Sequence, residues 1–350
     1  MNKEKFESLQ ALRFFAAFGV VLFHLFDYYH VKFGFKENYF IIGEFGVDVF
    51  FIMSGFIVAY TTNYEKGPGA FAIKRLSRVV PLYWILTTFV LFLVLLAPGA
   101  FNSTGLDFGN YVKSLLFIPY QKENGLVQPM LFLGWTLNYE MLFYAVVGVA
   151  LLSGRNFLAN ACLFIAILAV AGRIFPSSNV VWSFYTGGII LEFVFGVLVY
   201  ALLKEFPRQF RFYAKLSLLP AAILAGVLIF GHVSTPRPFG QGLIAMAIVA
   251  FAITVQLPAG IGSAWLVALG DASYSLYLSH PFILQVFIKF CEKHYSPALL
   301  VLGSAAAVIG CFALSLVLYR WLERPSQLWL VKQLSTGGRA VHYPAAVEPA

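Results

Sequence analysis

The stretch LQALRFFAAFGVVLFHLFDYY, residues 9–29, decides the fold of this chain. It is long enough to cross a bilayer, for which an α-helix needs about 20 apolar residues. The stretch nevertheless carries Arg13 near its start and His24 near its end, eleven positions later. That spacing is close to three turns of about 3.6 residues, so both side chains project from one helix face. Charged and titratable groups inside a membrane helix are costly, and they indicate a pathway or an active site that faces the protein interior.

The composition of the whole chain is that of a polytopic membrane protein. Hydrophobic residues make up 60% of the 350, aromatic residues 17% and charged residues 11%, and the mean hydropathy is +0.80. Soluble domains contain about 25% charged residues. The formal charge of +8 does not indicate nucleic-acid binding, because basic residues of membrane proteins concentrate in cytoplasmic loops. The three cysteines share no ligand spacing, so we expect small buried side chains with neither disulfides nor a metal site.

Apolar runs and helix breakers predict an all-α membrane domain of about ten transmembrane helices within residues 1–330. Pro81 is expected to open the third span and Pro281 to interrupt the ninth. The distribution of Lys and Arg among the loops predicts that both termini are cytoplasmic, which requires an even number of spans. Residues 331–350 are predicted to form a disordered cytoplasmic tail. The predicted spans cover 8–29, 41–62, 79–97, 129–152, 157–174, 184–203, 214–230, 240–257, 265–290 and 297–322.

The second span contains GVDVFFIMSGF, residues 46–56, with one carboxylate in an apolar run. Asp48 would be costly there without a partner. We predict His24 as that partner, because both residues fall in the outer part of adjacent antiparallel helices. A carboxylate beside an imidazole orients the ring and raises its basicity. Ser54 and Gly55 favour close helix packing, because small residues let two helices approach.

Two arginines precede the third span in FAIKRLSRVVPLYW, residues 71–84. Arg75 and Arg78 are three positions apart and share a face if this stretch is helical. One interpretation is the ordinary positive charge of a cytoplasmic loop. The other is recognition of an anionic ligand, because a planar guanidinium donates two parallel hydrogen bonds to a phosphate. The spacing leaves both interpretations open.

The fourth span contains LGWTLNYEMLFY, residues 133–144, in which Glu140 and Tyr144 are one helical turn apart. An acidic residue in the middle of a span is a functional candidate by default. The alternative is an ion pair between Glu140 and Arg13 that only supports the bundle. Glu192 in the sixth span raises the same question.

The ninth span contains LGDASYSLYLSHPF, residues 269–282. Asp271 is a predicted N-cap, and Ser273, Tyr277 and His280 share one helix face. Pro281 frees a backbone carbonyl close to His280, which indicates an irregular helix that faces a cavity. Two interpretations of His280 stay open, a place in a substrate site or a hydrogen-bonded structural role.

Taken together and in this order, the motifs resemble those of the acyltransferase-3 family of integral membrane acyltransferases. The resemblance covers residue 8 to about residue 325. The residues and motifs that carry it are Arg13 with His24, GVDVFFIMSGF, Arg75 and Arg78 ahead of Pro81, WTLNYEMLFY and SYSLYLSHPF.

This resemblance implies a roughly ten-helix enzyme that moves an acyl group, usually acetyl, from acyl-CoA to a hydroxyl of a cell-surface carbohydrate or a lipid-linked precursor. It implies His24 as the catalytic base, an essential Arg13, and a CoA donor near Arg75 and Arg78. The chain is similar to stand-alone exopolysaccharide O-acetyltransferases, because no esterase-like domain follows the spans. The further candidates are Asp48 and Glu140 for catalysis, and Tyr144, Tyr277 and His280 for substrate binding.

The expected setting is the bacterial inner membrane, with membrane lipid, the acceptor glycan and proteins of polysaccharide biosynthesis as partners. Two other functions fit the same residues. A transporter would use His24, Asp48 and Glu140 as a proton relay, although no repeated pair of interrupted spans is visible. The third function is a non-catalytic partner of a polysaccharide synthase. The sequence leaves open the acceptor sugar and its hydroxyl, the identity of the short acyl group and the side of the membrane on which the acceptor binds. It also leaves open the oligomeric state and whether transfer is direct or passes through an acyl-enzyme.

Overall fold

The computed structural model describes residues 6–97, 105–231, 233 and 235–335. These residues form helices joined by short connections, with one isolated β-bridge between Gln121 and Val127. The architecture is all-α, as predicted. The α-helices are α1 (Glu7–Phe33), α2 (Phe45–Thr61), α3 (Gly67–Leu96), α4 (Phe108–Leu115), α5 (Trp135–Ala150), α6 (Phe157–Ile174), α7 (Val180–Tyr185), α8 (Leu191–Glu205), α9 (Pro207–Leu216), α10 (Leu218–Phe230), α11 (Gln241–Thr254), α12 (Ile261–Asp271), α13 (Ser273–Lys293), α14 (Pro297–Leu318) and α15 (Arg324–Ser335).

Six helical stretches within the described ranges are long and apolar enough to cross a membrane, and α11 and α12 are shorter apolar helices. The prediction of an all-α polytopic membrane protein is therefore confirmed. The count of ten spans and the cytoplasmic position of both termini stay predictions. The six stretches are Glu7–Phe33, Ile41–Thr61, Tyr64–Leu96, Phe132–Ile174, Pro207–Phe230 and Pro297–Leu334.

Neither proline acts as predicted. The third helix begins at Gly67 and contains Pro81 in its interior, and α13 continues through Pro281. Membrane helices tolerate proline because neighbouring helices and small local adjustments satisfy the freed backbone groups. The predicted ninth span is instead broken at Ala272, between α12 and α13. Asp271 is the last residue of α12, so the predicted N-cap is wrong.

Two further boundaries differ from the prediction. The sixth span, 184–203, is divided, because α7 ends at Tyr185 and α8 begins at Leu191. The predicted tail begins too early, because residues 331–335 belong to α15, and the rest of the tail lies outside the described residues.

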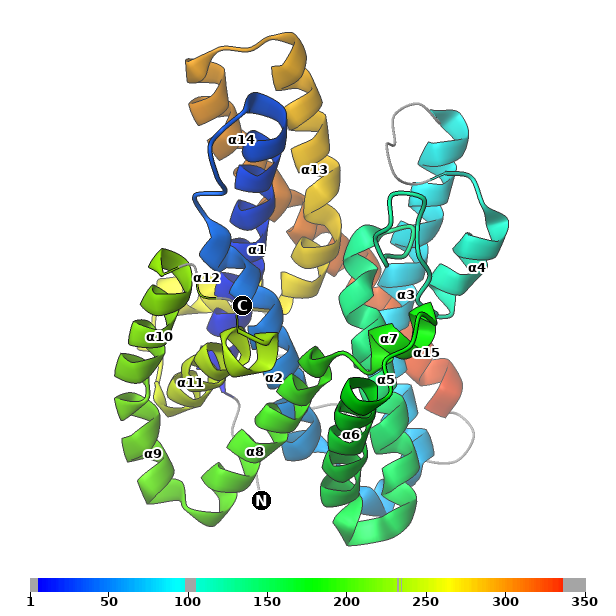
Figure 1. The fold of residues 1–350 in the computed structure, drawn as a ribbon, viewed down its shortest axis with the longest axis vertical. Coiled ribbons are helices and arrows are strands. Elements are labelled where there is room, and N and C mark those ends of the chain that lie inside the picture. Colours follow the sequence, from blue (N-terminus) through cyan, green and yellow to red (C-terminus); the bar gives the residue numbers. More distant parts are fainter. Residues whose placement is uncertain (1–5, 98–104, 232, 234, 336–350) are drawn as a thin grey trace.

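The first helix lies inside the bundle and packs against α2, α12 and α13. Figure 1 shows α1, α13 and α14 side by side at the top, with α9, α10 and α11 at the lower left. On the opposite side α5 packs against α3 and α6, and α15 packs on α3. The second helix joins these parts, because it contacts α1 and α11 on one side and α5 on the other.

Glycine brings α2 and α8 into direct backbone contact. A Cβ on Gly55 would lie 2.1 Å from the carbonyl oxygen of Phe193, and a Cβ on Gly196 would lie 2.0 Å from that of Ile52. No side chain fits at either position. The predicted packing role of Gly55 is confirmed. The neighbouring Ser54 faces α5, where its hydroxyl donates to Glu140.

Candidate functional site

Two histidines from different helices lie face to face inside the bundle. The rings of His24 on α1 and His280 on α13 have centroids 5.3 Å apart and an interplanar angle of 28°. Phe132 packs with its ring edge-on to His24 at 5.5 Å. Because α1 packs along α13, two candidates that are far apart in the sequence share one site.

Hydrogen bonding determines which nitrogen of His280 carries the proton in the neutral ring. Nδ1 lies 3.1 Å from the carbonyl oxygen of Leu276. A carbonyl only accepts, so Nδ1 is the donor and Nε2 keeps its lone pair. This Nε2 is buried, and within the described residues it has no hydrogen-bond partner. Both interpretations of His280 therefore keep support. Its Nδ1 makes a structural hydrogen bond, and its Nε2 can accept a hydrogen bond from a substrate.

The tyrosine one turn before His280 belongs to the same site. The Tyr277 hydroxyl lies 3.1 Å from Thr136 Oγ1 and donates to the carbonyl oxygen of Leu133 at 3.3 Å. Its ring centroid is 6.4 Å from that of His280. These contacts link α13 to the start of α5 and hold the Tyr277 ring next to the histidines.

Asp48 does not pair with His24, so that prediction is wrong. Its two carboxylate oxygens accept hydrogen bonds from Nε and Nη2 of Arg237, both at 2.9 Å. Arg237 also donates through Nη1 to Glu44. A short 3₁₀ turn, Arg237–Phe239, places the guanidinium there. The planar fork of Arg matches both oxygens of a carboxylate, and Arg237 therefore supplies the buried partner that Asp48 needs.

Glu192 adds a second acid beside this ion pair. It is fully buried and lies within electrostatic range of Asp48 and Arg237. Its Cγ lies 3.1 Å from where a Cβ on Gly242 would be, so α8 and α11 meet tightly here. This acidic group joins α2, α8 and the turn before α11.

The two predicted donor-binding arginines line one small pocket. It has a volume of about 120 Å³ and is formed by α2, α3 and α15. Arg75 donates to Thr61 Oγ1 at 2.7 Å and lies over the rings of Phe71 and Tyr144, at 5.6 and 5.8 Å. The stretch before Pro81 is helical, so the predicted shared face exists. The lining residues are Ile57, Thr61, Lys74, Arg75, Arg78 and Gln327.

Glu140 lies behind this pocket, because its partner Tyr144 packs beneath Arg75. It accepts hydrogen bonds from Ser54 Oγ at 2.9 Å and from the Tyr144 hydroxyl. The ion pairs found within the described residues include none between Glu140 and Arg13. Arg13 instead donates to Gln10 at 3.1 Å. The supporting-ion-pair interpretation of Glu140 is therefore wrong.

A buried acid that the sequence motifs do not single out, Glu323, lies in the π-helical turn Tyr319–Glu323. Its Oε2 accepts a hydrogen bond from Ser275. Arg13 and Arg78 both lie within its electrostatic range. Glu323 directly follows the predicted tenth span, 297–322, so it falls outside the apolar run in which a lone acid is conspicuous. The π turn, of a kind often found at functional sites, points this side chain inward.

The polar interior therefore has two ends. One end is the histidine pair with Tyr277, where α1 contributes His24. The other is the arginine pocket with Glu140, close to Arg13 of α1. A family model described as an acyltransferase domain matches residues 6–320. The chain belongs to the acyltransferase-3 family. It is a membrane-embedded acyltransferase, which favours an enzyme over the transporter.

Similar proteins fit this membership. The chain is 35% identical over 298 residues to the exopolysaccharide production protein ExoZ of Rhizobium meliloti (strain 1021), covering 82% of this chain and 90% of that protein. It is 21% identical over 309 residues to the O-acetyl transferase of Shigella phage Sf6, covering 84% and 88%. Nodulation protein 10 of Rhizobium leguminosarum bv. viciae is 27% identical over 177 residues, covering 45% and 48%. No solved structure matches the chain at a significant level.

Proposed function

We propose that this acyltransferase moves an acetyl or similar short acyl group from acyl-CoA to a hydroxyl of an exopolysaccharide or another cell-surface carbohydrate precursor. The observation that carries the proposal is the stacked histidine pair, half-buried His24 and buried His280, at the far end of α1 from a pocket lined by arginines. The names of two relatives, an exopolysaccharide production protein and an O-acetyl transferase, support the substrate class.

The donor binds at the arginine pocket. Phosphate groups of CoA fit Arg78, Lys74 and Arg75, because guanidinium and ammonium groups form charge-assisted hydrogen bonds with phosphate oxygens. The pocket itself holds only a small anionic group at about 120 Å³. The thioester end then enters the bundle past Arg13, which lies within electrostatic range of Arg78, Glu140 and Glu323.

His24 is the general base. It takes the proton of the acceptor hydroxyl while that oxygen attacks the thioester carbonyl carbon. In the net reaction the new C–O ester bond forms, the C–S bond breaks, and the proton held by His24 passes to the leaving thiolate to give free CoA. His280 accepts a hydrogen bond through Nε2 from a neighbouring hydroxyl of the acceptor, which orients the sugar.

The setting is the bacterial inner membrane, where a cytoplasmic donor reaches an intramembrane site. The acceptor is a glycan, free or carried on a lipid, that proteins of polysaccharide biosynthesis deliver. Because the arginine pocket and the histidine pair lie at two ends of the polar interior, donor and acceptor approach from different sides of the site.

The test is transfer of label from acetyl-CoA to acceptor glycan in membranes that contain the protein. His24→Ala should lower the rate by about 10²–10⁴, the usual contribution of a general base. His294→Ala is the matched control, because His294 is exposed at the end of α13. Equal transfer by wild type and His24→Ala would refute the assignment. Proton-coupled uptake without label transfer would instead favour a transporter.

A further inference from the structure

Helix α13 carries a buried hydroxyl on the same face as the histidine of the candidate site. The Ser273 side chain is 0% exposed, and its Oγ has no hydrogen-bond partner within the described residues. Ser273 precedes Tyr277 by four positions and His280 by seven, so the three side chains share one helix face. His280 stacks from this face on His24 of α1. Ser273 therefore faces the polar interior, and a buried hydroxyl without a partner is costly unless a ligand supplies one.

The segment around Ser273 runs parallel to α1. Before it, a Cβ on Gly270 would lie 2.0 Å from the carbonyl oxygen of Gln10. After it, His280 stacks on His24. Because the residue numbers rise together from the first contact to the second, Ser273 lies beside the part of α1 between Gln10 and His24. The proposed donor arm must pass along this part of α1.

The arginines of the proposed donor path lie near the same end of α13. Arg13 lies within electrostatic range of both Arg78 and Asp271. Asp271 is two positions before Ser273 in the chain. Seven residues of α-helix, about 10 Å along the axis, then separate Ser273 from His280. Ser273 thus lies between the arginine pocket and the histidine pair.

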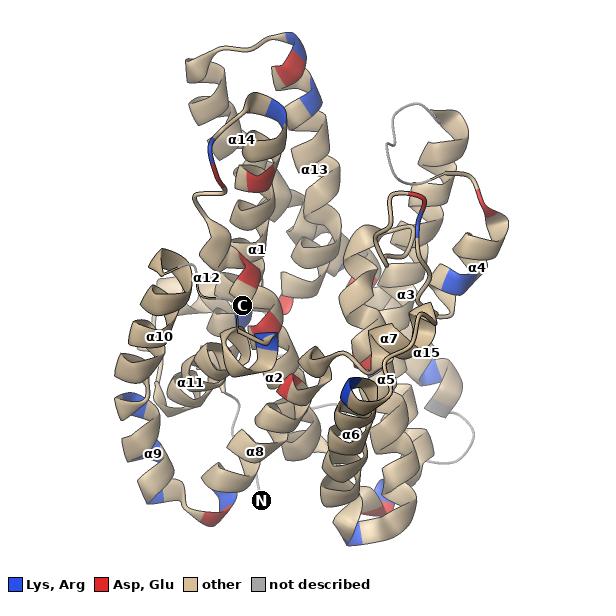
Figure 2. Ribbon diagram, in the orientation of Figure 1, with Lys and Arg blue, Asp and Glu red and all other residues tan. Residues whose placement is uncertain are grey.

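The inner part of α13 offers polar groups of a kind that suits a neutral ligand. Residues 273–288 contain no Lys, Arg, Asp or Glu, and Figure 2 shows the charged positions of this helix at its upper end. A phosphate would find no countercharge on this helix face. An amide needs only one neutral donor or acceptor, and a hydroxyl can serve as either.

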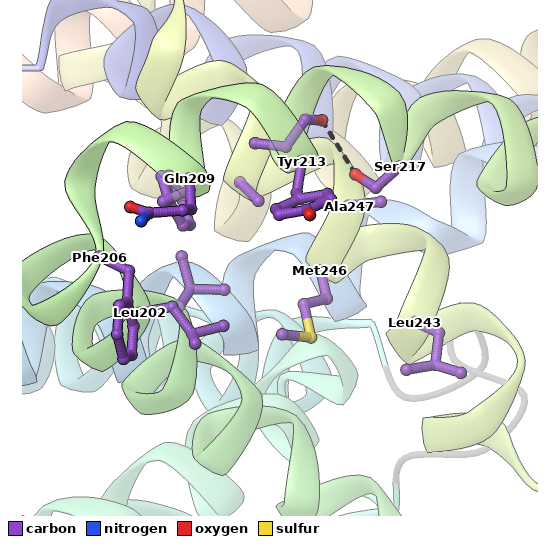
Figure 3. Close-up of a pocket in the computed structure, with 12 residues that line it drawn as sticks. Leu202, Phe206, Gln209, Tyr213, Ser217, Leu243, Met246 and Ala247 are labelled. Atoms are coloured by element: carbon purple, nitrogen blue, oxygen red, sulfur yellow. Dashed lines mark hydrogen bonds between the residues drawn. The ribbon is translucent and has the colours of Figure 1, made fainter.

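A second cavity, an apolar groove of about 450 Å³ between α8, α9 and α11, takes no part in this path. Figure 3 shows side chains around it, among them Leu202, Tyr213 and Met246. The described residues that line the groove include none from α1, α3 or α13. A donor arm in the groove would bypass both histidines, so the polar interior beside α13 is the route that fits the reaction.

We propose that Ser273 forms a hydrogen bond with an amide in the pantetheine arm of acyl-CoA, where that arm passes from the arginine pocket to the histidine pair. The inference rests on the proposed acyl-CoA donor. The arm carries two amides, and burial of an amide without a hydrogen bond is costly. The Ser273 hydroxyl donates to an amide carbonyl or accepts from an amide N–H. Ser273 is therefore a donor-binding residue that lies away from the reacting carbonyl.

The experiment measures label transfer from acetyl-CoA to acceptor glycan in membranes that contain the full chain. Ser273→Ala should raise the KM for acetyl-CoA about 2–10-fold, the effect of one neutral hydrogen bond, with kcat unchanged. The midpoint of thermal unfolding without donor should stay equal or rise, because the hydroxyl has no partner in the described part of the free protein.

Ser279→Ala is the matched control. Its Oγ is equally buried and has no hydrogen-bond partner among the described side chains and backbone. One residue of α-helix turns Ser279 by about 100° from His280, so it does not share the face of Ser273. This variant should keep the wild-type KM for acetyl-CoA.

Truncated donors separate the amides from the phosphates. S-Acetylpantetheine keeps both amides and has no phosphate, whereas ethyl thioacetate has neither. The loss of kcat/KM in Ser273→Ala should be the same about 2–10-fold with S-acetylpantetheine and should vanish with ethyl thioacetate. Arg78→Gln should instead lose its effect already with S-acetylpantetheine.

An unchanged KM for acetyl-CoA in Ser273→Ala, or an equal rise in Ser279→Ala, would overturn the inference while the proposed function stands. A fall in kcat at constant KM would also overturn it, because Ser273 would then act at the reacting atoms. Absence of transfer from acetyl-CoA by the wild type would refute the proposed donor itself, and the inference with it.

Discussion

Arg237 and Asp48 form a bidentate ion pair between segments that lie 189 residues apart in the chain. The Asp48 side chain is 0% exposed and that of Arg237 is 24% exposed. Removal of one partner would leave a charge buried without compensation, which is far more costly than loss of an exposed pair. This pair fastens the turn before α11 onto the start of α2.

The first prediction concerns this pair. Arg237→Met should lower the free energy of unfolding by about 3–5 kcal/mol, because the buried Asp48 carboxyl loses the partner of both its oxygens. The double variant with Asp48→Leu should be less destabilised than the sum of the two single variants. Denaturant unfolding of the four proteins measures the coupling. Lys204→Met is the control, with an expected cost below about 1 kcal/mol. Additive effects would contradict the coupling.

His280→Asn separates the two nitrogens of this ring. The Asn amide keeps a donor for the Leu276 carbonyl and removes the acceptor Nε2. We expect the KM for the acceptor to rise about 2–10-fold, the effect of one neutral hydrogen bond, with little change in kcat. Kinetics at varied acceptor concentration measure this split, and His294→Asn is the control. A large fall in kcat at constant KM would show that His280, not His24, is the base.

The proposed donor pocket is best tested at Arg78, because Arg75 also donates to Thr61 and lies over aromatic rings. Arg78→Gln should raise the KM for acyl-CoA roughly 10–100-fold, the effect of one charge-assisted hydrogen bond of about 1.5–3 kcal/mol. Arg320→Gln removes an exposed charge outside the pocket and serves as control. An unchanged KM in Arg78→Gln would refute donor binding at this site.

Gly55→Ala should be strongly destabilising, because its methyl group would lie 2.1 Å from the Phe193 carbonyl oxygen. We expect a thermal midpoint lowered by many degrees, or loss of the folded protein from the membrane. Gly148→Ala offers the comparison, because a Cβ there meets no atom within 4 Å. That change should be neutral or stabilise α5 by up to about 1 kcal/mol. Similar midpoints for the two variants would refute the close α2–α8 contact.

Local pattern was enough to predict the helical membrane fold and several interior polar residues. Arg13, His24 and Glu140 stood out because charge inside an apolar run is visible from one segment alone. The shared face of Arg75 and Arg78 also followed from spacing, and it exists in α3. Such inferences need only helix periodicity and hydropathy.

Partners could not be predicted, because they depend on packing between distant segments. Asp48 was assigned to His24 from their similar depth, whereas the turn at Arg237 supplies a better geometric match. That arginine lies between Pro236 and Pro238 just before a span, which was the available signal. Glu323 was missed because a π turn changes which way its side chain faces. The break at Ala272 contains no proline, and its one signal was the charge of the neighbouring Asp271.

Arg13 and His24 lie on one uninterrupted helix, α1, which has no proline between them. This helix fixes the distance between the two residues, because a rise of about 1.5 Å per residue over eleven residues separates their backbones by roughly 16 Å along the axis. An insertion or deletion in α1 cannot change this distance alone, because each residue also rotates the side chains that follow it. A one-residue insertion would rotate His24 by about 100° away from His280. In the proposed reaction, the reach required of the donor's acyl arm is therefore set by the residue count of α1.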